Sequence, residues 1–369
     1  MNVFPPINKS FYTINNEPAA NLKECLGMMS REQLNTLVDN YSFDYEVFES
    51  EDQIVEFLSD RILNLCDYYF KLKSEDVGMA YLEYMPESPE AVVEDQIFSE
   101  IEDEYTKKLQ GTIEEFVQFG LMFHFVDEDD YDHLVMPVEL CMEFVSENLG
   151  NDGRNKFGIY SRFSQIAEIL VSLYGIVPAK IMEAVWNQQY PNRKITEELC
   201  GDLMEVSSFT DGIADYYNKE LVNPSIFDEL YEYLKKEREN KPRFIPSGTQ
   251  IDVMLKMMDE DKTFCSNFYN EFEYEYNNDD YENLKSFLKI YYKGKVSLEE
   301  VLFHICFYTK AGYPLTQVVK ILNEKDFLLS GMDDSVAERF GSLFKLFNET
   351  CHHWTSWGWS PRDYEKYNS

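Results

Sequence analysis

The stretch CHHWTSWGWSP, residues 351–361, gathers side chains that could bind a metal ion. It holds three of the four tryptophans and two of the five histidines of the chain. Thiolate and imidazole groups are zinc ligands, but Cys351, His352 and His353 are adjacent, and neighbouring side chains on a helix point about 100° apart. Further ligands would have to come from another helix. We therefore predict no metal site and no cofactor here.

A structural role explains the same stretch. Gly358 can adopt a left-handed turn, Ser360 can cap a short helix, and Pro361 suits the first helical position. Each tryptophan ring buries a large area when it packs against a core. We predict a structural anchor that holds this segment on the core. The anchor residues are Trp354, Trp357, Gly358, Trp359 and Pro361.

The stretch EDDYDHLVMPVE has part of the spacing of a calcium loop. The carboxylates at its first, third, fifth and twelfth positions are Glu128, Asp130, Asp132 and Glu139. The sixth position of such a loop requires glycine for a sharp turn, and here it is His133. We therefore predict a solvated hairpin tip and no calcium site.

The stretch FCSNFYNEFEYEYNNDDYENLK interleaves acidic and aromatic residues, without Lys or Arg from Phe264 to Leu284. One interpretation is an amphipathic element with a solvated acidic face. The other is a recognition surface, because aromatic residues are enriched in interface cores and acids attract cationic partners. The predicted partner-binding residues are Glu271, Tyr274, Glu275, Tyr276, Asp279, Asp280 and Tyr281.

Motifs for nucleophilic, phosphate-binding, dinucleotide-binding and zinc-protease chemistry are absent from the sequence. His124, His133 and His304 lie in apolar stretches, which is typical of packed or hydrogen-bonded histidines. Carboxylates are so abundant that they do not indicate an acid–base site. We predict a protein that is not an enzyme, and keep a catalytic site of unfamiliar type, built from distant residues, as a third hypothesis.

The formal net charge of −35 indicates the kind of partner. An acidic surface repels nucleic-acid phosphates and anionic lipid, and attracts basic protein surfaces. Solubility alone is the other explanation. The one basic run, KKERENKPR, is interpreted as a helix end and linker, because cations stabilise the C-terminus of a helix. We expect a basic protein partner, and neither direct nucleic-acid binding nor membrane association.

Cysteine usage and hydropathy indicate the compartment. The seven cysteines are scattered and never form a C-x-x-C pair, which favours a reducing environment. The first residues, MNVFPPINKS, lack a basic stretch followed by an apolar one, so no signal peptide is expected. The longest apolar runs are too short to span a bilayer. We expect a cytoplasmic protein.

The elements that carry these residues are predicted to be mainly helices. Ser30 with Gln33 and Ser50 with Gln53 form two capping boxes, each followed by apolar residues at helical spacing. This predicts helix, extended stretch and helix near the start of the chain. Further on, strands are expected at 121–126 and 133–136, followed by a helix with Pro137 in its first turn.

Three short helices are predicted after residue 160. Gly175 ends the first, Pro178 opens the second and Thr196 caps the third. The pieces LVMPVEL and LVNPSIF share the pattern L-V-x-P before a helix, which suggests two related winged-helix-like units. Apolar residues then recur at helical spacing in 284–308 and 313–329.

The predicted fold is a mainly α, multi-module helical protein with small β-hairpins in winged-helix-like units. Four modules are expected. They are a helix–extended–helix module at 1–66, winged-helix-like modules at 67–156 and 157–241, and a C-terminal helical domain at 242–369, with the linker placed at KERENKPRFIPSGTQ.

The first module resembles helix–extended–helix modules of the Rho-terminator N-terminal and SAP type. The pieces GLMFHF, VMPVEL, LYGIVPAKIMEAVW, KPRFIPS and FNETCHHWTSWGWSPRD resemble uncharacterised bacterial proteins with a Rho-N-like start, a winged-helix-like middle and a helical end. Some of those proteins end in a SEC-C zinc motif. That motif requires a tight cysteine cluster, which this sequence does not contain, so the resemblance implies no zinc and no activity.

Two binding functions remain from the sequence. The first is a non-catalytic interaction or regulatory protein of the bacterial cytoplasm whose acidic and aromatic faces bind a basic protein. The alternative is a nucleic-acid mimic, for example in phage–host conflict, that occupies the basic cleft of a DNA- or RNA-binding protein. Modules that usually bind nucleic acid but carry the opposite charge motivate this alternative.

Overall fold

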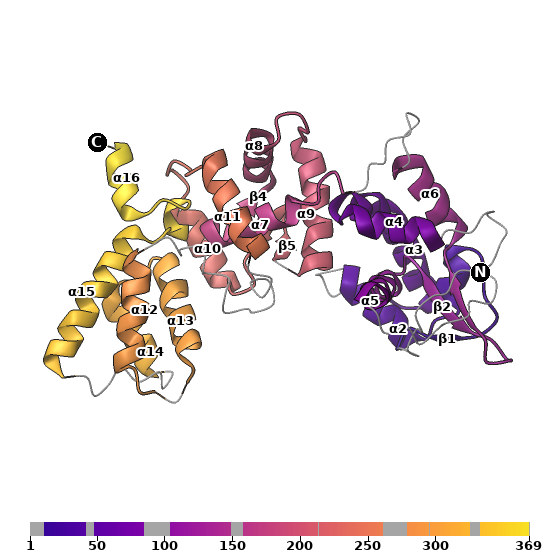
Figure 1. The fold of residues 1–369 in the computed structure, drawn as a ribbon, viewed down its shortest axis with the longest axis horizontal. Coiled ribbons are helices and arrows are strands. Elements are labelled where there is room, and N and C mark those ends of the chain that lie inside the picture. Colours follow the sequence, from indigo (N-terminus) through magenta and orange to yellow (C-terminus); the bar gives the residue numbers. More distant parts are fainter. Residues whose placement is uncertain are drawn as a thin grey trace. The chain divides into compact units, whose positions relative to one another are not determined.

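The computed structural model describes residues 11–41, 48–84, 104–148, 158–212, 214–260, 279–294, 296–324 and 333–368. These residues fold mainly into helices, with two small three-stranded sheets (Figure 1). The predicted mainly α class with small β elements is therefore confirmed. The chain divides into two compact units, unit 1 (1–163 and 205–212) and unit 2 (164–204 and 213–369).

The second and third helices of unit 1 have starts that are fixed by hydrogen bonds from their own side chains. The amides of Ser30 and Gln33 exchange hydrogen bonds with each other's side chains at 2.7 and 3.3 Å. The amide of Gln53 donates to Ser50 Oγ, while Gln53 Oε1 accepts from the amide of Glu49. Both predicted helix starts are confirmed. The helices of unit 1 are α1 (Leu22–Gly27), α2 (Arg31–Tyr41), α3 (Glu51–Leu72), α4 (Glu75–Tyr84), α5 (Glu104–Gln118) and α6 (Val138–Asn148).

The sheet of unit 1 has the strand order β1-β2-β3. The hairpin of β2 (Phe123–Val126) and β3 (Asp132–Val135) matches the predicted pair of strands, although β2 starts two residues later than expected and β3 is shifted by one residue. The sequence did not indicate β1 (Ile14–Asn15), which pairs in parallel with β2. A strand of two residues has no detectable alternation, and its partner lies more than a hundred residues away.

Aromatic rings from four helices form the core of unit 1. Phe70 of α3 lies 4.5 Å from Tyr81 of α4 and 4.6 Å from Phe144 of α6, measured between ring centres. Phe116 of α5 lies 5.2 Å from Tyr81. All four rings are buried. Offset and edge-to-face packing of such rings stabilises a core beyond the area that it buries.

Unit 2 opens with the helices and strands predicted after residue 160. Gly175, with φ of 70°, ends the first helix, and Thr196 Oγ1 accepts from the amide of Leu199 to cap the third. The antiparallel sheet has the order β4-β6-β5, so its first strand pairs with its last. These elements are α7 (Phe163–Tyr174), β4 (Ile176–Pro178), α8 (Ala179–Gln189), α9 (Glu197–Asp211), β5 (Asp215–Tyr217) and β6 (Glu220–Val222). The second half of α9, from Glu205, belongs to unit 1.

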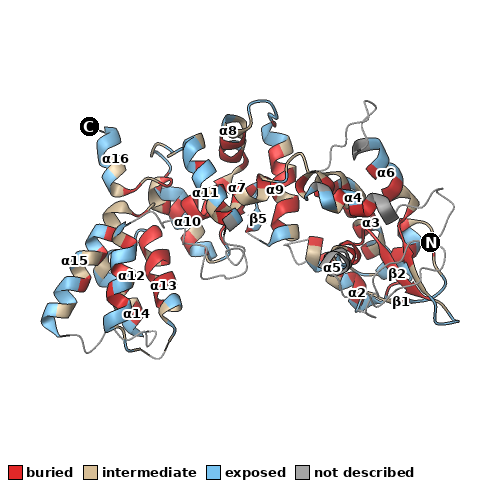
Figure 2. Ribbon diagram, in the orientation of Figure 1, coloured by how far each residue is buried: buried red, intermediate tan, exposed pale blue. Residues whose placement is uncertain are grey.

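Seven further α-helices and one 3-10 helix complete the described part of unit 2. One continuous apolar core joins β4, β6, α10, α12 to α15 and the 3-10 helix. In Figure 2 most of α13 is buried, whereas no residue of α16 is. The elements are α10 (Asp228–Glu237), α11 (Gly248–Glu260), α12 (Asp279–Tyr291), α13 (Leu298–Lys310), α14 (Leu315–Glu324), α15 (Asp334–Thr350), η4 (Trp354–Ser356) and α16 (Pro361–Asn368).

Two of the predicted module boundaries fall inside packed structure. The boundary after residue 66 lies within α3, which runs unbroken to Leu72. The boundary after residue 241 crosses the core of unit 2, because α10 before it and α12 to α15 after it share that core. Residues 242–247 form an irregular connection between α10 and α11 within unit 2. No helix in the described residues has both the length and the apolar composition needed to cross a membrane.

Candidate functional site

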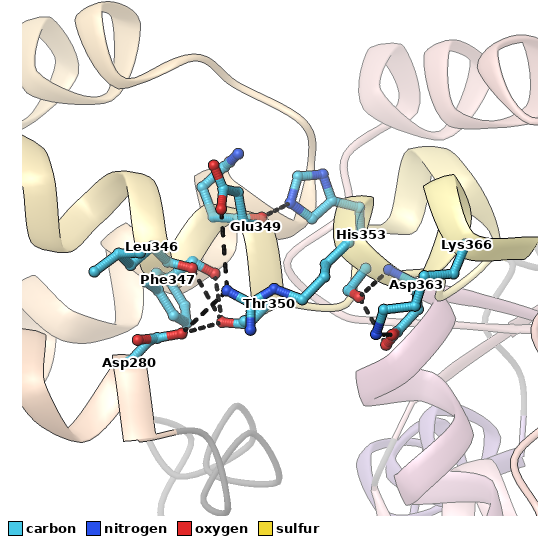
Figure 3. A network of polar contacts seen from close by, with 11 residues as sticks. Asp280, Leu346, Phe347, Glu349, Thr350, His353, Asp363 and Lys366 are labelled. Atoms are coloured by element: carbon cyan, nitrogen blue, oxygen red, sulfur yellow. Dashed lines mark hydrogen bonds and ion pairs between the residues drawn. The ribbon is translucent and has the colours of Figure 1, made fainter. Parts of the chain in front are cut away.

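Cys351, His352 and His353 each have a separate structural environment. Cys351 is fully buried. A ring nitrogen of His352 donates to the carbonyl of Gly358, and one of His353 donates to the carbonyl of Asn348 at 3.1 Å (Figure 3). Among the described residues, no group of three or more His, Cys, Asp or Glu side chains is arranged to hold a metal ion.

The three tryptophans of this stretch all donate hydrogen bonds to distant backbone carbonyls. The indole nitrogen of Trp354 lies 3.0 Å from the carbonyl oxygen of Ser172. Trp357 donates to Arg238 at 2.7 Å, and Trp359 donates to Pro242 at 3.0 Å. Buried indole N–H groups need such partners. These contacts attach residues 354–359 to α7 and to the segment after α10, all within unit 2.

The backbone of the same stretch makes a tight left-handed turn. Trp357 and Gly358 have φ of 53° and 77°. A Cβ atom on Gly358 would lie 2.8 Å from the ring of Tyr174, so both conformation and space require glycine. Ser360 Oγ then accepts from the amide of Asp363, and Pro361 is the first residue of α16. The five predicted anchor residues therefore lie in one packed turn.

The basic run interpreted as a linker packs directly against this turn. Arg238 is fully buried, and its guanidinium lies 3.9 Å from the centre of the Trp357 ring. It donates to the carbonyl of Tyr174 at 3.0 Å, and burial lowers its pKa to about 10. Lys310, also fully buried, donates to the carbonyl of Ser172. Two buried cations thus meet the negative C-terminal end of α7.

Of the predicted partner-binding residues, Glu271, Tyr274, Glu275 and Tyr276 lie outside the described residues. The remaining three belong to α12. Asp279 is exposed, whereas Asp280 accepts from Thr350 Oγ1 at 3.3 Å and lies 3.8 Å from Arg362 (Figure 3).

Tyr281 does not belong to an exposed surface. It is 4% exposed, and its ring lies 5.7 Å from that of Phe347 in the core of unit 2. It was predicted as a contact because its neighbours are acidic. Its place one turn before Leu284 on the buried face of α12 decides its role instead.

The acidic hairpin tip uses its side chains to hold its own turn. Asp127 accepts from the amides of Asp129 and Tyr131 and from His133. Asp132 pairs with the buried ring of His124 at 2.9 Å.

The fourth carboxylate of the supposed calcium pattern is also engaged. Glu139 accepts from the amide of Leu22 at 3.1 Å, at the start of α1. Asp132 and Glu139 of the pattern therefore serve separate structural contacts.

A surface on α10 that the sequence did not single out combines exposed acids with exposed rings. Asp228, Glu229 and Glu232 are exposed, and we call them the α10 acidic face. In the described part of the chain, no Lys or Arg lies within ion-pair distance of these three carboxylates. Leu230 and Leu234 bury the opposite side of the helix. The position of α10 on the core therefore fixes this face toward solvent.

Aromatic rings border the α10 acidic face on both sides. On one side, Phe227 and Tyr217 are 54% and 53% exposed, and Tyr217 lies 5.8 Å from Tyr231. On the other side, Tyr233 is 43% exposed.

Of the two lysines in the last turn of α10, Lys235 is already neutralised, whereas Lys236 is exposed one turn after Glu232. The buried carboxylate of Glu220 accepts from Lys235 Nζ at 2.7 Å and from the hydroxyl of Tyr231 at 2.6 Å. Lys235 therefore does not cancel the charge of the α10 acidic face.

The spacing of Asp228, Glu229 and Glu232 could have predicted that these acids share one side of a helix. Tyr217 of β5 and Glu220 of β6 could not have been predicted as their neighbours, because they come from other elements of the chain.

Comparison with known proteins identifies no relative. No family model matches the chain, and no curated protein or solved structure is significantly similar to it.

Proposed function

We propose that this chain is a non-catalytic binding protein whose α10 acidic face receives a basic protein segment. The observation that carries the proposal is the exposure of Asp228, Glu229 and Glu232 between rings that are about half exposed. Carboxylates attract cationic side chains, and aromatic rings bind them by cation–π contact while burying apolar area.

The charge of the whole chain supports the same class of partner. A net charge of −35 raises the rate of encounter with basic proteins and lowers it for nucleic acids. Because exposed charges are screened over about 8 Å at physiological salt, binding driven by this face weakens as salt rises. Strong salt dependence is thus part of the proposal.

The compartment we infer is a reducing one, such as the cytoplasm. Six cysteines in the described residues are free and buried. Burial raises the pKa of the Cys25 thiol to about 12 and that of Cys141 to about 11. Such thiols act as small apolar side chains and are poor nucleophiles.

Nucleic-acid mimicry is the second candidate, and the element order of residues 163–222 favours it. Three helices and a hairpin, with β4 paired to β6, are expected of a winged-helix-like unit. Its third helix, α9, carries five acids and no Lys or Arg. Seven of its fifteen residues are buried and none is basic, so direct DNA binding through this helix is not supported. An acidic body of this kind would instead compete with DNA for a basic cleft.

The test is affinity capture with three forms of the chain: unmodified, D228N/E229Q/E232Q, and E51Q/D52N/D60N. The last removes three exposed carboxylates from α3, two of them in the first turn as on α10, and serves as the matched control. We expect the same basic protein to be captured by the unmodified chain and the control at low salt, and lost with the α10 variant. Equal capture by all three forms would show that this face is not the binding site.

Added DNA separates the two candidates. A partner displaced by DNA from the unmodified chain supports mimicry. A partner that stays bound in the presence of DNA supports a dedicated protein-binding function.

A further inference from the structure

One side of the Arg238 guanidinium has no hydrogen-bond partner, although the whole side chain is buried. Nη1 donates to the carbonyl of Tyr174 at 3.0 Å. Nε and Nη2 are buried and bond to no residue that the structure describes. These two nitrogens form one edge of the planar group, so their N–H groups point in nearly the same direction. Arginine binds anions through such a fork with two parallel hydrogen bonds.

No carboxylate of the described ranges lies within ion-pair distance of Arg238. The carboxylate that acts on it electrostatically is Glu220. Both oxygens of Glu220 already accept from Lys235, at 2.7 and 2.8 Å, and one of them also accepts from the Tyr231 hydroxyl at 2.6 Å. Burial lowers the pKa of Arg238 to about 10, even though Glu220 acts in the opposite direction. The guanidinium is therefore taken out of water without a carboxylate to neutralise it.

The end of α7 balances only part of this charge. Burying a cation is unfavourable unless an opposite charge pairs with it. The carbonyls at the C-terminus of a helix together carry about half an elementary negative charge. Here they accept from Arg238 and also from the fully buried Lys310. The buried fork thus combines two free donors with positive charge that the helix end does not cancel.

Two further cations lie at the same turn. Arg243 lies over the Trp357 ring at 4.9 Å, is exposed, and forms no ion pair with any described residue. Lys241 donates to the carbonyl of Thr355 at 2.9 Å, and its charge is balanced by Glu237 at 4.0 Å. In a chain with a net charge of −35, the turn is therefore a local positive region. Arg243 forms its solvent-facing side.

We infer that the Nε–Nη2 fork of Arg238 binds a small monovalent anion of the size of chloride, which stabilises the turn at 354–359. One negative charge balances the single charge of Arg238, whereas a phosphate dianion would bury a second charge without a partner. The fork atoms are closed to solvent, which also favours a small ion. This inference concerns a different site from the α10 acidic face and does not depend on the function proposed above.

The test is urea unfolding followed by tryptophan fluorescence, which reports on unit 2 because all four tryptophans lie there. Sodium chloride is compared with sodium gluconate at equal ionic strength, so that screening of the surface charges is the same. Gluconate is too large to enter a closed fork. Above the dissociation constant, each tenfold rise in chloride should lower the unfolding equilibrium constant of unit 2 by about tenfold relative to gluconate.

Arg238→Lys keeps the positive charge but removes the fork, so it should abolish the difference between the two salts. Arg193→Lys makes the same change at an exposed arginine of unit 2 and should leave the difference intact. Equal unfolding of the unmodified chain in the two salts would overturn the inference. A chloride effect that persists in Arg238→Lys would show that the ion binds elsewhere.

A second measurement does not depend on the folding of any variant. Crystals of the unmodified chain soaked in sodium bromide should give an anomalous-scattering peak beside Nε and Nη2 of Arg238. Absence of that peak would overturn the inference and leave the fork to water. Stabilisation by phosphate without stabilisation by chloride would equally contradict a small monovalent ion.

Discussion

The guanidinium of Arg238 lies 3.9 Å from the centre of the Trp357 indole ring, and the Trp357 indole N–H donates to the carbonyl of the same arginine. The two residues are 119 positions apart. This double contact joins the basic run after α10 to the tryptophan-rich stretch before α16. Its consequences can be measured, because all four tryptophans lie in unit 2 and their fluorescence reports on that unit.

Arg238→Ala should lower the free energy of unfolding of unit 2 by about 2–4 kcal/mol. The substitution removes a buried cation from the C-terminal end of α7, leaves a cavity and uncovers the Trp357 ring. Urea unfolding followed by tryptophan fluorescence measures the effect. Arg243→Ala is the control, because Arg243 lies over the same ring at 4.9 Å but is exposed, and should cost less than about 1 kcal/mol. Equal losses would contradict a special role for the buried arginine.

Gly358→Ala should destabilise unit 2 by about 1–3 kcal/mol, because alanine is strained at φ of 77° and its Cβ would meet Tyr174. Gly111→Ala should instead stabilise unit 1 by about 0.5–1 kcal/mol, since Gly111 lies inside α5 with nothing within 4 Å of a new Cβ. Thermal melting of both variants checks the opposite signs. A stabilising Gly358→Ala would disprove the left-handed turn.

The two capping boxes should differ in strength. Gln33 also donates to the carbonyls of Phe11 and Thr13, whereas Gln53 caps the start of its helix alone. Gln53→Ala should cost about 1 kcal/mol and Gln33→Ala about 2–3 kcal/mol, since the latter leaves further carbonyls without a donor. Hydrogen exchange of the amides of α2 and α3 measures both losses. Equal costs would indicate that the contacts to Phe11 and Thr13 contribute nothing.

Stability should fall steeply in alkaline solution. Burial raises the pKa of Tyr41, Tyr69 and Tyr81 well above the ordinary 10.0. A raised pKa in the folded state means that the unfolded chain loses these protons first, so stability is complete below pH 10 and decreases above it. Tyrosinate absorbance and circular dichroism should therefore change together. Gradual tyrosine ionisation in a chain that stays folded would contradict this prediction.

Local features of the fold could be predicted because each depends on residues a few positions apart. The capping boxes at Ser30 and Ser50, the helix stop at Gly175 and the cap at Thr196 follow from side chains that reach their own neighbouring backbone. The β2–β3 hairpin follows from two apolar stretches around an acidic turn. The left-handed turn at Gly358 is likewise a local feature, because it depends on the conformational freedom of one glycine.

Contacts between distant segments were decided only by the tertiary structure. The sequence shows that KKERENKPR is basic and that CHHWTSWGWSP is rich in tryptophan, but not that Arg238 is buried against Trp357. Likewise, local charge suggested that Tyr281 is exposed, whereas the packing of α12 on α15 buries it.

The composition of the chain determined its acidity and its mainly helical class, since net charge and apolar spacing are summed over many residues. Neither the composition nor the apolar spacing determined which acids and aromatic rings share one exposed surface. The α10 acidic face and the partly exposed Tyr233 face solvent because Leu230 and Leu234 bury the other side of α10 in the core of unit 2. The free energy of that burial belongs to the whole core, so no short stretch of sequence specifies the surface that it leaves exposed.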